Sequence, residues 1–547
     1  MLNEGCEGMN RLFYGDNLAV LRESIADESV DLVYLDPPFN SNRSYNVLFK
    51  NKSGTDSQAQ IEAFDDTWTW SQQSEEQYDQ LVRYAPPRVA ECVRALRGLV
   101  GPNDVLAYLV MMTSRLVELH RVLRSTGSLY LHCDPTASHY LKIVLDSIFD
   151  PRNFRGEIVW RRYGAHNDVK KNYAAVHDSI LFYAKSPAAT FTTQYLEHDP
   201  EYVERAYRHK DPDGRRWQSQ NLASPNPRPN LTYPYTALNQ ETYEPHPNGW
   251  KVSPERMLEL DQQGRLVYPS KPTGRLRVKN YLDEMKGPAL GDLWADVPPL
   301  TGSNAERLGY PTQKPVALLE RILAASSNPG DVILDPFCGC GTSIDAAQRM
   351  GRQWIGIDVT FLAVDLIEKR LKDTFYDHQI SYDVRGIPED LEGALSLFKA
   401  NPFDFERWAV SLVDATPNER QVGDRGSDGV IRFPTDNRTG MGMGLVSVKG
   451  GKTVNPAMVR DLAGTIDHHR ADLGVFVCMT KPTGGMLEVA RHSGDYVWPV
   501  DGRRFPRLQI STIESLLAGQ KPQMPTPILP YSRSRRLVSD QQYQFAL

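Results

Sequence analysis

The tetrapeptide Asp36-Pro37-Pro38-Phe39 follows residues 30–35, an apolar run that is typical of a buried strand. The carboxylate of Asp36 and the main-chain carbonyl of Pro37 can both accept hydrogen bonds from the exocyclic amino group of a nucleobase. The lone pair of such a nitrogen is delocalised into the ring, and these two acceptors favour the tetrahedral geometry of a nucleophile. Pro37 and Pro38 make the carbonyl rigid, and Phe39 can stack on a base rotated out of a duplex. Taken alone, the tetrapeptide is equally well an ordinary strand end with two prolines.

A second constellation is the run Asp335-Pro336-Phe337-Cys338-Gly339-Cys340-Gly341-Thr342, between a predicted strand at 332–334 and a predicted helix at 344–350. Glycines in a strand-to-helix turn let a ligand approach the backbone, and the helix N-terminus attracts a carboxylate. The next predicted strand, residues 354–357, ends in Asp358, an acidic residue at the spacing expected for binding ribose hydroxyls. Together they predict a site for a nucleotide-like cofactor, although a glycine turn of this kind is often purely structural.

The elements that position both constellations alternate between helical and strand-like patterns, which is typical of an α/β fold with a largely parallel sheet. We expect helices at 107–123, 141–148 and 316–325, and strands at 128–132, 157–160 and 179–183. The alternation is interrupted at 186–300, where Pro, Asn, Tyr and Arg accumulate, and this stretch is expected to be an inserted module.

Taken together, these patterns predict a division of the chain into six segments. A first catalytic part spans 1–185, the inserted region 186–300, a cofactor-binding part 301–380, a linker 381–402, a second α/β domain 403–517 and an extended tail 518–547.

The order of these motifs resembles that of the beta-class amino-methyltransferases of DNA, over about residues 11–371. The resemblance rests on the tetrapeptide, on Tyr310-Pro311-Thr312-Gln313-Lys314-Pro315 and on the glycine run. It implies a Rossmann-like fold that binds S-adenosylmethionine, with residues 186–300 as a target recognition domain. It also implies roles for Asp16 at the cofactor's adenine, for Thr312, Gln313, Lys314 and Pro315 along its methionine end, and for Asp335, Phe337, Gly339, Gly341, Thr342 and Asp358 around the rest. His132-Cys133-Asp134 and His177-Asp178 resemble the pocket motifs of that family.

The implied activity is methyl transfer to N6 of adenine in double-stranded DNA, in a restriction-modification or defence system. Asp36, Pro37, Pro38 and Phe39 would be its catalytic residues. Asp at position 36, rather than Ser, points to adenine, and N4 of cytosine stays open as an alternative. Methylation at C5 of cytosine is disfavoured, because that reaction needs a Pro-Cys nucleophile that the sequence lacks. Cys340 departs from the Ser that the family often has between the two glycines.

The second domain resembles the Mrr-like branch of the restriction-endonuclease folds. Glu406, Asp428 and Lys449 match its nuclease residues, and Asp428 would hold magnesium. Ser447 stands where the family usually has Glu or Gln, and a hydroxyl is a much weaker magnesium ligand than a carboxylate. Two interpretations therefore stay open: an active nuclease, or an inactive domain that only binds DNA in an enzyme or a regulator.

The composition agrees with a globular DNA-binding protein. The 547 residues have a net charge of -6, yet residues 151–290 contain more Lys and Arg than Asp and Glu. No apolar run of about 20 residues is present, so we expect a cytoplasmic protein that does not enter a membrane. The six cysteines form no zinc or disulfide pattern. Double-stranded DNA is the expected partner, and a homodimer is left open.

Overall fold

The structure is a computed structural model whose contacts divide the chain into two compact units, Thr193–Gly291 and the remainder. The residues described are 10–38, 46–50, 56–62, 70–162, 173–271, 274–301, 304, 306–308, 310, 312–376, 380–418, 427–435 and 440–527, with backbone only at 46–50 and 56–62.

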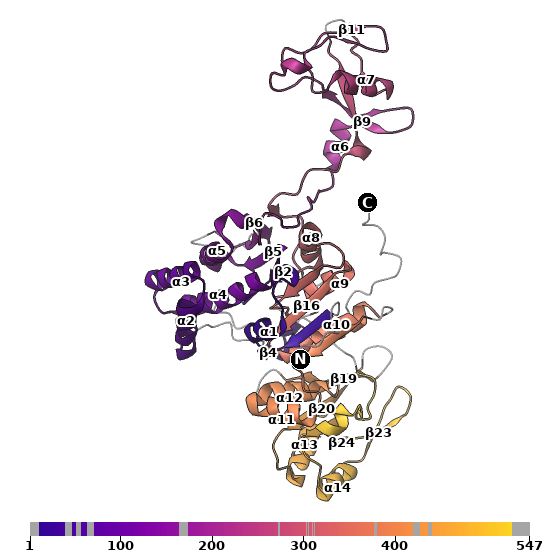
Figure 1. Ribbon diagram of the computed structural model, residues 1–547. Helices are drawn as coiled ribbons and strands as arrows, with labels where there is room; N and C mark the ends of the chain where they lie inside the picture. Colours follow the sequence, from indigo (N-terminus) through magenta and orange to yellow (C-terminus); the bar gives the residue numbers. More distant parts are fainter. Residues whose placement is uncertain are drawn as a thin grey trace. The chain divides into compact units, whose positions relative to one another are not determined.

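The larger unit is built on a nine-stranded sheet in the order β14-β6-β7-β5-β2-β15-β16-β1-β17 (Figure 1). Every neighbouring pair is parallel except those of β7, which runs antiparallel to β5 and β6. In sheet order the strands are β14 (Leu293–Trp294), β6 (Phe154–Arg161), β7 (His177–Ala184), β5 (Leu123–Cys133), β2 (Val30–Leu35), β15 (Val332–Asp335), β16 (Gln353–Asp358), β1 (Asn10–Tyr14) and β17 (Tyr382–Arg385). This sheet confirms the predicted α/β fold class.

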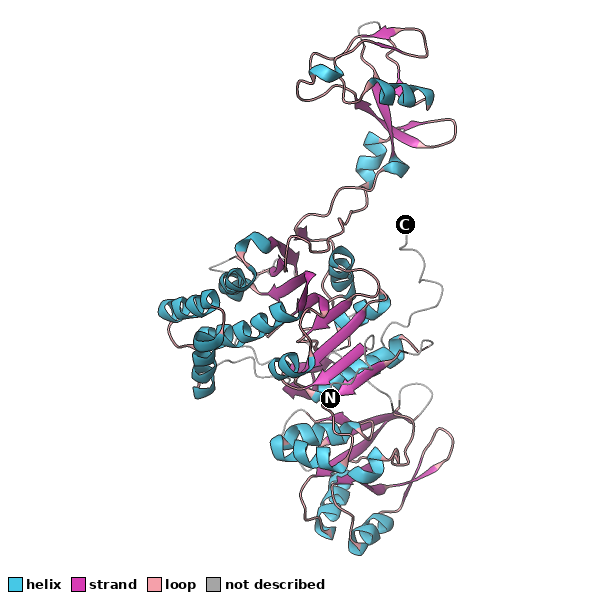
Figure 2. Ribbon diagram, in the orientation of Figure 1, coloured by secondary structure: helices cyan, strands magenta, loops and turns pink. Residues whose placement is uncertain are grey.

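Helices cover both faces of the sheet (Figure 2). Alternate residues of β2 and β5, such as Val33 and Leu129, pack into one apolar core with α1 (Asn17–Ser24), α4 (Asp104–Val122) and α5 (Pro135–Phe149). The intervening residues point the other way, where the Tyr130 hydroxyl lies 2.6 Å from that of Ser326. That face carries α8 (Val316–Ser326), α9 (Thr342–Arg349) and α10 (Phe361–Thr374). Two further helices, α2 (Gln72–Tyr84) and α3 (Pro87–Val100), pack on the first layer, and β3 (Asn46–Lys50) pairs with β4 (Asp56–Glu62).

Residues 381–402, which we expected to be a linker, are ordered as secondary structure instead. They contain β17, which pairs with β1 at the sheet edge, and α11 (Leu391–Ala400). An edge strand is half exposed and can be polar, as Tyr-Asp-Val-Arg is here, so its sequence does not differ from that of a polar linker.

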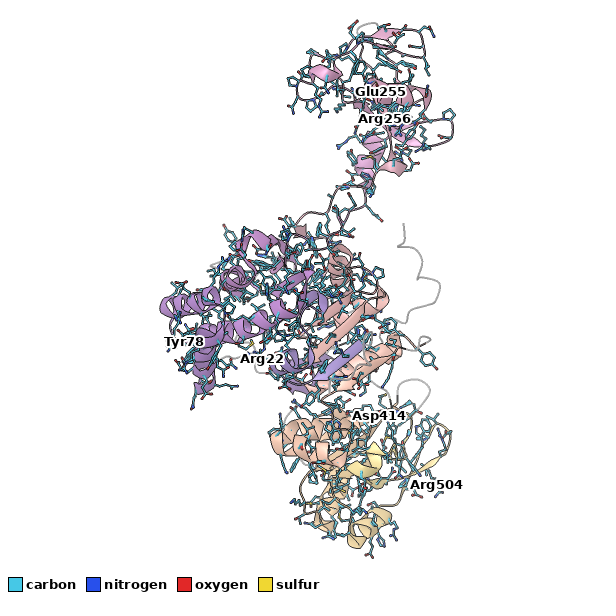
Figure 3. All side chains as sticks on the ribbon, viewed as in Figure 1. Arg22, Tyr78, Glu255, Arg256, Asp414 and Arg504 are labelled. Atoms are coloured by element: carbon cyan, nitrogen blue, oxygen red, sulfur yellow. The ribbon has the colours of Figure 1, made fainter. Side chains whose placement is uncertain are left out.

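The smaller unit has a four-stranded sheet, β12-β13-β9-β8, and a core that includes Leu222, Trp250 and Met257. Several of its charged residues pair with one another: Arg215 binds Asp283 and Lys279 binds Asp211. Glu255 and Arg256 are in the first turn of α7 (Figure 3). The elements are α6 (Pro200–Ala206), β8 (His209–Lys210), β9 (Arg216–Asn221), β10 (Tyr235–Thr236), β11 (Thr242–Tyr243), α7 (Pro254–Gln262), β12 (Leu266–Val267) and β13 (Arg277–Tyr281).

The C-terminal part contains a five-stranded sheet, β18-β19-β20-β21-β24, with an apolar core on each face. Residues 518–527 contain neither helix nor strand. The elements are α12 (Pro402–Ser411), β18 (Thr416–Pro417), β19 (Gly429–Pro434), β20 (Met441–Lys449), α13 (Pro456–His468), β21 (Leu473–Cys478), α14 (Gly484–His492), β22 (Asp495–Val497), β23 (Arg504–Pro506), β24 (Leu508–Thr512) and α15 (Ile513–Leu517). None of the helices within the described ranges is both long and apolar enough for a membrane span.

Candidate active site

Four parallel strands, β2, β15, β16 and β1, lie side by side, and the chain leaves each of them at the same edge of the sheet. Asp36 follows β2, and β15 and β16 end at Asp335 and Asp358. Asp16 follows β1 after one glycine. Because carboxyl ends of neighbouring parallel strands meet at one edge, residues far apart in the sequence form one site.

A single cavity at this edge contains most of the residues predicted for the two halves of the site. Predicted residues in its wall are Asp16, Asp36, Pro37, Pro38, Thr312, Gln313, Lys314, Asp335, Phe337, Gly339, Thr342 and Asp358. Pro315 and Gly341 are outside the wall, and Phe39 lies outside the described residues. The wall also contains residues that the sequence did not single out, among them Asn17, Tyr34, Met111 and Arg115.

At the target end of the cavity, the ammonium group of Lys314 forms an ion pair with Oδ2 of Asp36. Both side chains are mostly buried, at 10% and 15% exposed. Lys314 therefore orients the carboxylate of Asp36 through its Oδ2 atom. Lys314 was expected along the methionine end of the cofactor, and its contact with Asp36 places it at the target-base motif as well.

The glycine run folds as a tight turn into α9. Gly339 and Gly341 both have positive φ, 49° and 73°, where a side chain is strained. A Cβ on Gly339 would lie 3.3 Å from the ring of Tyr310, whereas a Cβ on Gly341 would lie 2.7 Å from the side chain of Ile367 on α10. Gly339 thus keeps the cavity open, and Gly341 allows two helices to pack.

Asp358 braces this turn. Its Oδ2 accepts a hydrogen bond of 2.9 Å from the backbone NH of Gly339, and its Oδ1 accepts two of 2.8 Å from the NH and hydroxyl of Thr360. Burial raises the pKa of Asp358 despite these donors. The residue lies in the cavity wall, as its predicted contact with a ribose requires, but it also has a structural role that the spacing did not indicate.

Asp335 is the most strongly perturbed carboxyl group of the site. Burial raises its pKa to about 7, against hydrogen bonds from Ser343 Oγ at 2.5 Å and from the NH of Phe337 at 3.0 Å. The charges of Asp36 and Asp358 raise the same pKa further. Perturbed acids of this kind are concentrated in functional sites.

Arg115 ties the Asp16 side of the cavity to the glycine run. Its Nη2 donates to Asp16 Oδ1 over 2.6 Å, and its Nε donates to Asn17 Oδ1 over 2.5 Å. Asn17 in turn donates to the carbonyl of Pro336 over 2.7 Å. The sequence signal for Arg115 was a single arginine within the otherwise buried part of an apolar helix, 9% exposed in the structure.

In the C-terminal part, the structure brings together three of the four residues predicted for a nuclease. Asp428 Oδ2 accepts from the NH of Val448 at 2.5 Å and from Ser447 Oγ at 3.2 Å, and Lys449 Nζ lies 3.7 Å away. Glu406 is on α12. Within the described ranges, no group of three His, Cys, Asp or Glu side chains is arranged to hold a metal ion. The donors all engage Oδ2 of Asp428, and with the Ser447 hydroxyl in place of a second carboxylate these residues do not fit a magnesium site.

Comparison with known proteins gives two family matches. Residues 404–501 match the model described as NACHT-associated inactive Restriction Endonuclease 1, which supports a nuclease-like domain in the C-terminal part. Residues 30–369, more than half of the chain, match the model N6_N4_Mtase, described as DNA methylase.

Three curated relatives align with the same part of the chain. Type II methyltransferase M.EcaI of Enterobacter cloacae is 28% identical over 66% of this chain and 69% of its own length. The StyLTI Mod subunit, a type III restriction-modification enzyme of Salmonella typhimurium, is 25% identical over 64% of this chain and 52% of its own length. DNA adenine methyltransferase YhdJ of Escherichia coli is 24% identical over 66% of this chain and 82% of its own length. With its family model covering both the strand that precedes Asp36 and the glycine run, this chain belongs to the N6_N4_Mtase family of DNA methylases.

Proposed function

We propose that the protein transfers a methyl group from S-adenosylmethionine to the N6 amino group of adenine in double-stranded DNA. The observation that carries this proposal is the shared cavity, in which Asp36 and Pro37 lie in the same wall as Gly339 and Asp358. A base and a methyl donor bound there would be in contact.

The residues present fit S-adenosylmethionine. The wall offers the carboxylate of Asp16 for adenine and that of Asp358 for ribose, and the open turn at Gly339, where a Cβ would approach Tyr310, for the backbone contact. When bound, this cofactor supplies an electrophilic methyl group on a sulfonium. The protein's share of the work is to hold that group at the end of β2 and to exclude water.

Asp36 and the carbonyl of Pro37 accept the two hydrogens of the amino group in this proposal. The accepted hydrogens localise the nitrogen lone pair, which makes the nitrogen a better nucleophile. Asp at position 36 favours adenine, and N4 of cytosine is the second candidate because its amino group offers the same two hydrogens. Phe39 would stack on the extruded base.

The unit Thr193–Gly291 is proposed to read the target sequence, as the position of its segment between the two motif groups suggests. Arg215 and Lys279 of this unit are already paired with acidic residues, so we expect other basic side chains to contact the phosphates of DNA. The biological setting proposed is a restriction-modification system, as the names of the relatives suggest. A homodimer is the oligomeric state included in this proposal.

The C-terminal domain is proposed to bind DNA without cleaving it. Val448, Ser447 and Lys449 all contact Oδ2 of Asp428, and the hydroxyl of Ser447 replaces a ligand that magnesium would need. The methyltransferase would then be the only catalytic activity of these two parts.

The experiment is mass spectrometry of nucleosides from duplex DNA incubated with the protein and S-adenosylmethionine. We expect N6-methyldeoxyadenosine. Exclusive formation of N4-methyldeoxycytidine would transfer the proposal to the second candidate, and no methylated nucleoside on DNA of diverse sequence would refute it.

A further inference from the structure

A line of buried polar side chains runs from the cavity into the sheet beside Asp36. Tyr34 is in the cavity wall, two residues before Asp36 on β2, so the two side chains are expected on the same face. The Tyr34 hydroxyl lies 3.0 Å from Nδ1 of His132 on β5. The Nε2 atom of His132 lies 3.1 Å from Oδ2 of Asp178 on β7, and Arg162 Nη1 lies 3.0 Å from the other oxygen of Asp178.

The direction of each hydrogen bond in this line follows from the chemistry of its members. His132 and Asp178 are both completely buried. Although burial opposes its ionisation, the hydrogen bond from His132 and the charges of Lys314 and Arg162 lower the pKa of Asp178. A carboxylate can only accept, so Nε2 of His132 carries the hydrogen. In the neutral ring Nδ1 then carries no hydrogen and accepts from the hydroxyl of Tyr34.

A methyltransferase that acts on an amino group must dispose of one proton. The nitrogen uses its lone pair to bond the methyl carbon while the carbon–sulfur bond breaks and sulfur keeps that electron pair. The nitrogen becomes positively charged and must release a hydrogen. Asp36 is the carboxylate that the proposal places at the amino group, but one of its oxygens is already paired with Lys314. Another acceptor for the released proton is therefore needed.

We propose that Tyr34, His132 and Asp178 form a proton relay that accepts this hydrogen, an inference that rests on the proposed methyl transfer. The amino hydrogen that was directed at the Pro37 carbonyl, which cannot keep a proton, passes to Tyr34 Oη while the hydrogen of Tyr34 passes to Nδ1 of His132. The resulting imidazolium is stabilised by the carboxylate of Asp178, and the transfers reverse to water when the product leaves. Tyr34 contacts the substrate, and His132 and Asp178 are positioning residues that act through it.

Burial, followed by the charges of Asp36, Asp335 and Asp178, raises the pKa of Tyr34 well above its ordinary value. The phenol therefore stays protonated and conducts a proton without becoming a stable phenolate. A group with this property can pass a proton on to His132, but it cannot act as a base that is deprotonated before the reaction.

Tyr34→Phe and Asp178→Asn test the relay, and Tyr130→Phe is their matched control. Tyr130 is paired in register with Tyr34 and equally buried, but its hydroxyl bonds Ser326. In single-turnover methyl transfer to duplex DNA, we expect Tyr34→Phe and Asp178→Asn to lose about 100-fold in rate, the range of general acid–base catalysis. Their affinities for S-adenosylmethionine, measured by calorimetry, should stay within about twofold of the wild type, and Tyr130→Phe should keep its rate within that factor as well.

The ¹⁵N NMR signals of His132, assigned by comparison with His132→Gln, give a readout that does not depend on activity. The wild type should show the hydrogen on Nε2. Asp178→Asn removes the carboxylate that fixes this tautomer, so the fraction of rings with the hydrogen on Nε2 should fall in that variant.

A wild type with the hydrogen on Nδ1, or a Tyr34→Phe variant as fast as Tyr130→Phe, would overturn the relay alone. A wild type that methylates no base would overturn the proposed function and the relay with it. The two failures are thus distinguishable.

Discussion

The ammonium group of Lys314 is paired with the carboxylate of Asp36, which precedes it by 278 residues in the chain. Asp36 ends the strand of the target-base motif, and Lys314 precedes α8. The pair therefore joins the two halves of the site directly, and it sets the orientation in which Asp36 meets an incoming amino group.

Lys314→Met should lower the free energy of unfolding by about 3 kcal/mol, because it leaves a largely buried carboxylate without its partner. The double variant Asp36→Asn/Lys314→Met removes both charges and should recover most of that loss. Urea unfolding of the two single variants, the double variant and the wild type measures this coupling. A change in unfolding free energy on Asp36→Asn that is the same in the wild type and in Lys314→Met would mean that the pair contributes nothing.

Asp335 should make the apo protein less stable as the pH rises. Its folded-state pKa, about 7, is raised above the ordinary value of 3.8, so the folded state holds the proton more tightly than the unfolded one. The contribution of protonated Asp335 to the free energy of unfolding is fully present below about pH 4 and is lost as the pH rises through about 7. The melting temperature of Asp335→Asn should therefore fall less than that of the wild type between pH 5 and pH 8. Parallel curves for the two proteins would show that Asp335 ionises without cost.

Gly341→Ala and Gly330→Ala separate backbone strain from steric overlap. Both glycines have positive φ, but a Cβ at Gly330 meets nothing within 4 Å, whereas one at Gly341 meets Ile367 at 2.7 Å. Gly330→Ala should lose about 1 kcal/mol of unfolding free energy, and Gly341→Ala should lose more, about 3 kcal/mol. Chemical denaturation compares them, and equal losses would remove the role assigned to the contact between α9 and α10.

The C-terminal domain should leave supercoiled plasmid intact in magnesium or manganese, on methylated and unmethylated DNA alike. Asp428 Oδ2 is occupied by the NH of Val448 and by Ser447. Agarose electrophoresis gives the readout. Nicked or linear product that disappears in Asp428→Asn would contradict the assignment of this domain as non-cleaving.

The sequence was sufficient for features that are local along the chain. The strand before Asp36 and the turn at Gly339 each depend on a short run of residues, and the parallel order of strands then places both at one edge. The sequence was not sufficient for side-chain pairs between distant segments. Arg115 meets Asp16 99 residues away, and Tyr34 meets His132 98 residues away, and neither pair leaves a periodic signal.

Chain organisation was harder to predict where elements are polar. Strand β17 lies in the stretch expected to be a linker, because an exposed edge strand needs few apolar residues. Helix α11 lies there too, although its Leu395, Leu397 and Phe398 pack against the apolar core of the C-terminal part. In the C-terminal part, the sequence was informative at Ser447, which stands where related nucleases usually have Glu or Gln. In the structure its hydroxyl donates a hydrogen bond to Asp428.

The proposed methyl transfer requires that Asp36 and the glycine run form a single site. Its most direct test is transfer of a labelled methyl group from S-adenosylmethionine to duplex DNA by the wild type and by Asp36→Ala, with cofactor affinity measured on both. We predict that both proteins bind the cofactor with similar affinity and that only the wild type labels DNA. Labelling by Asp36→Ala at the rate of the wild type would contradict the claim.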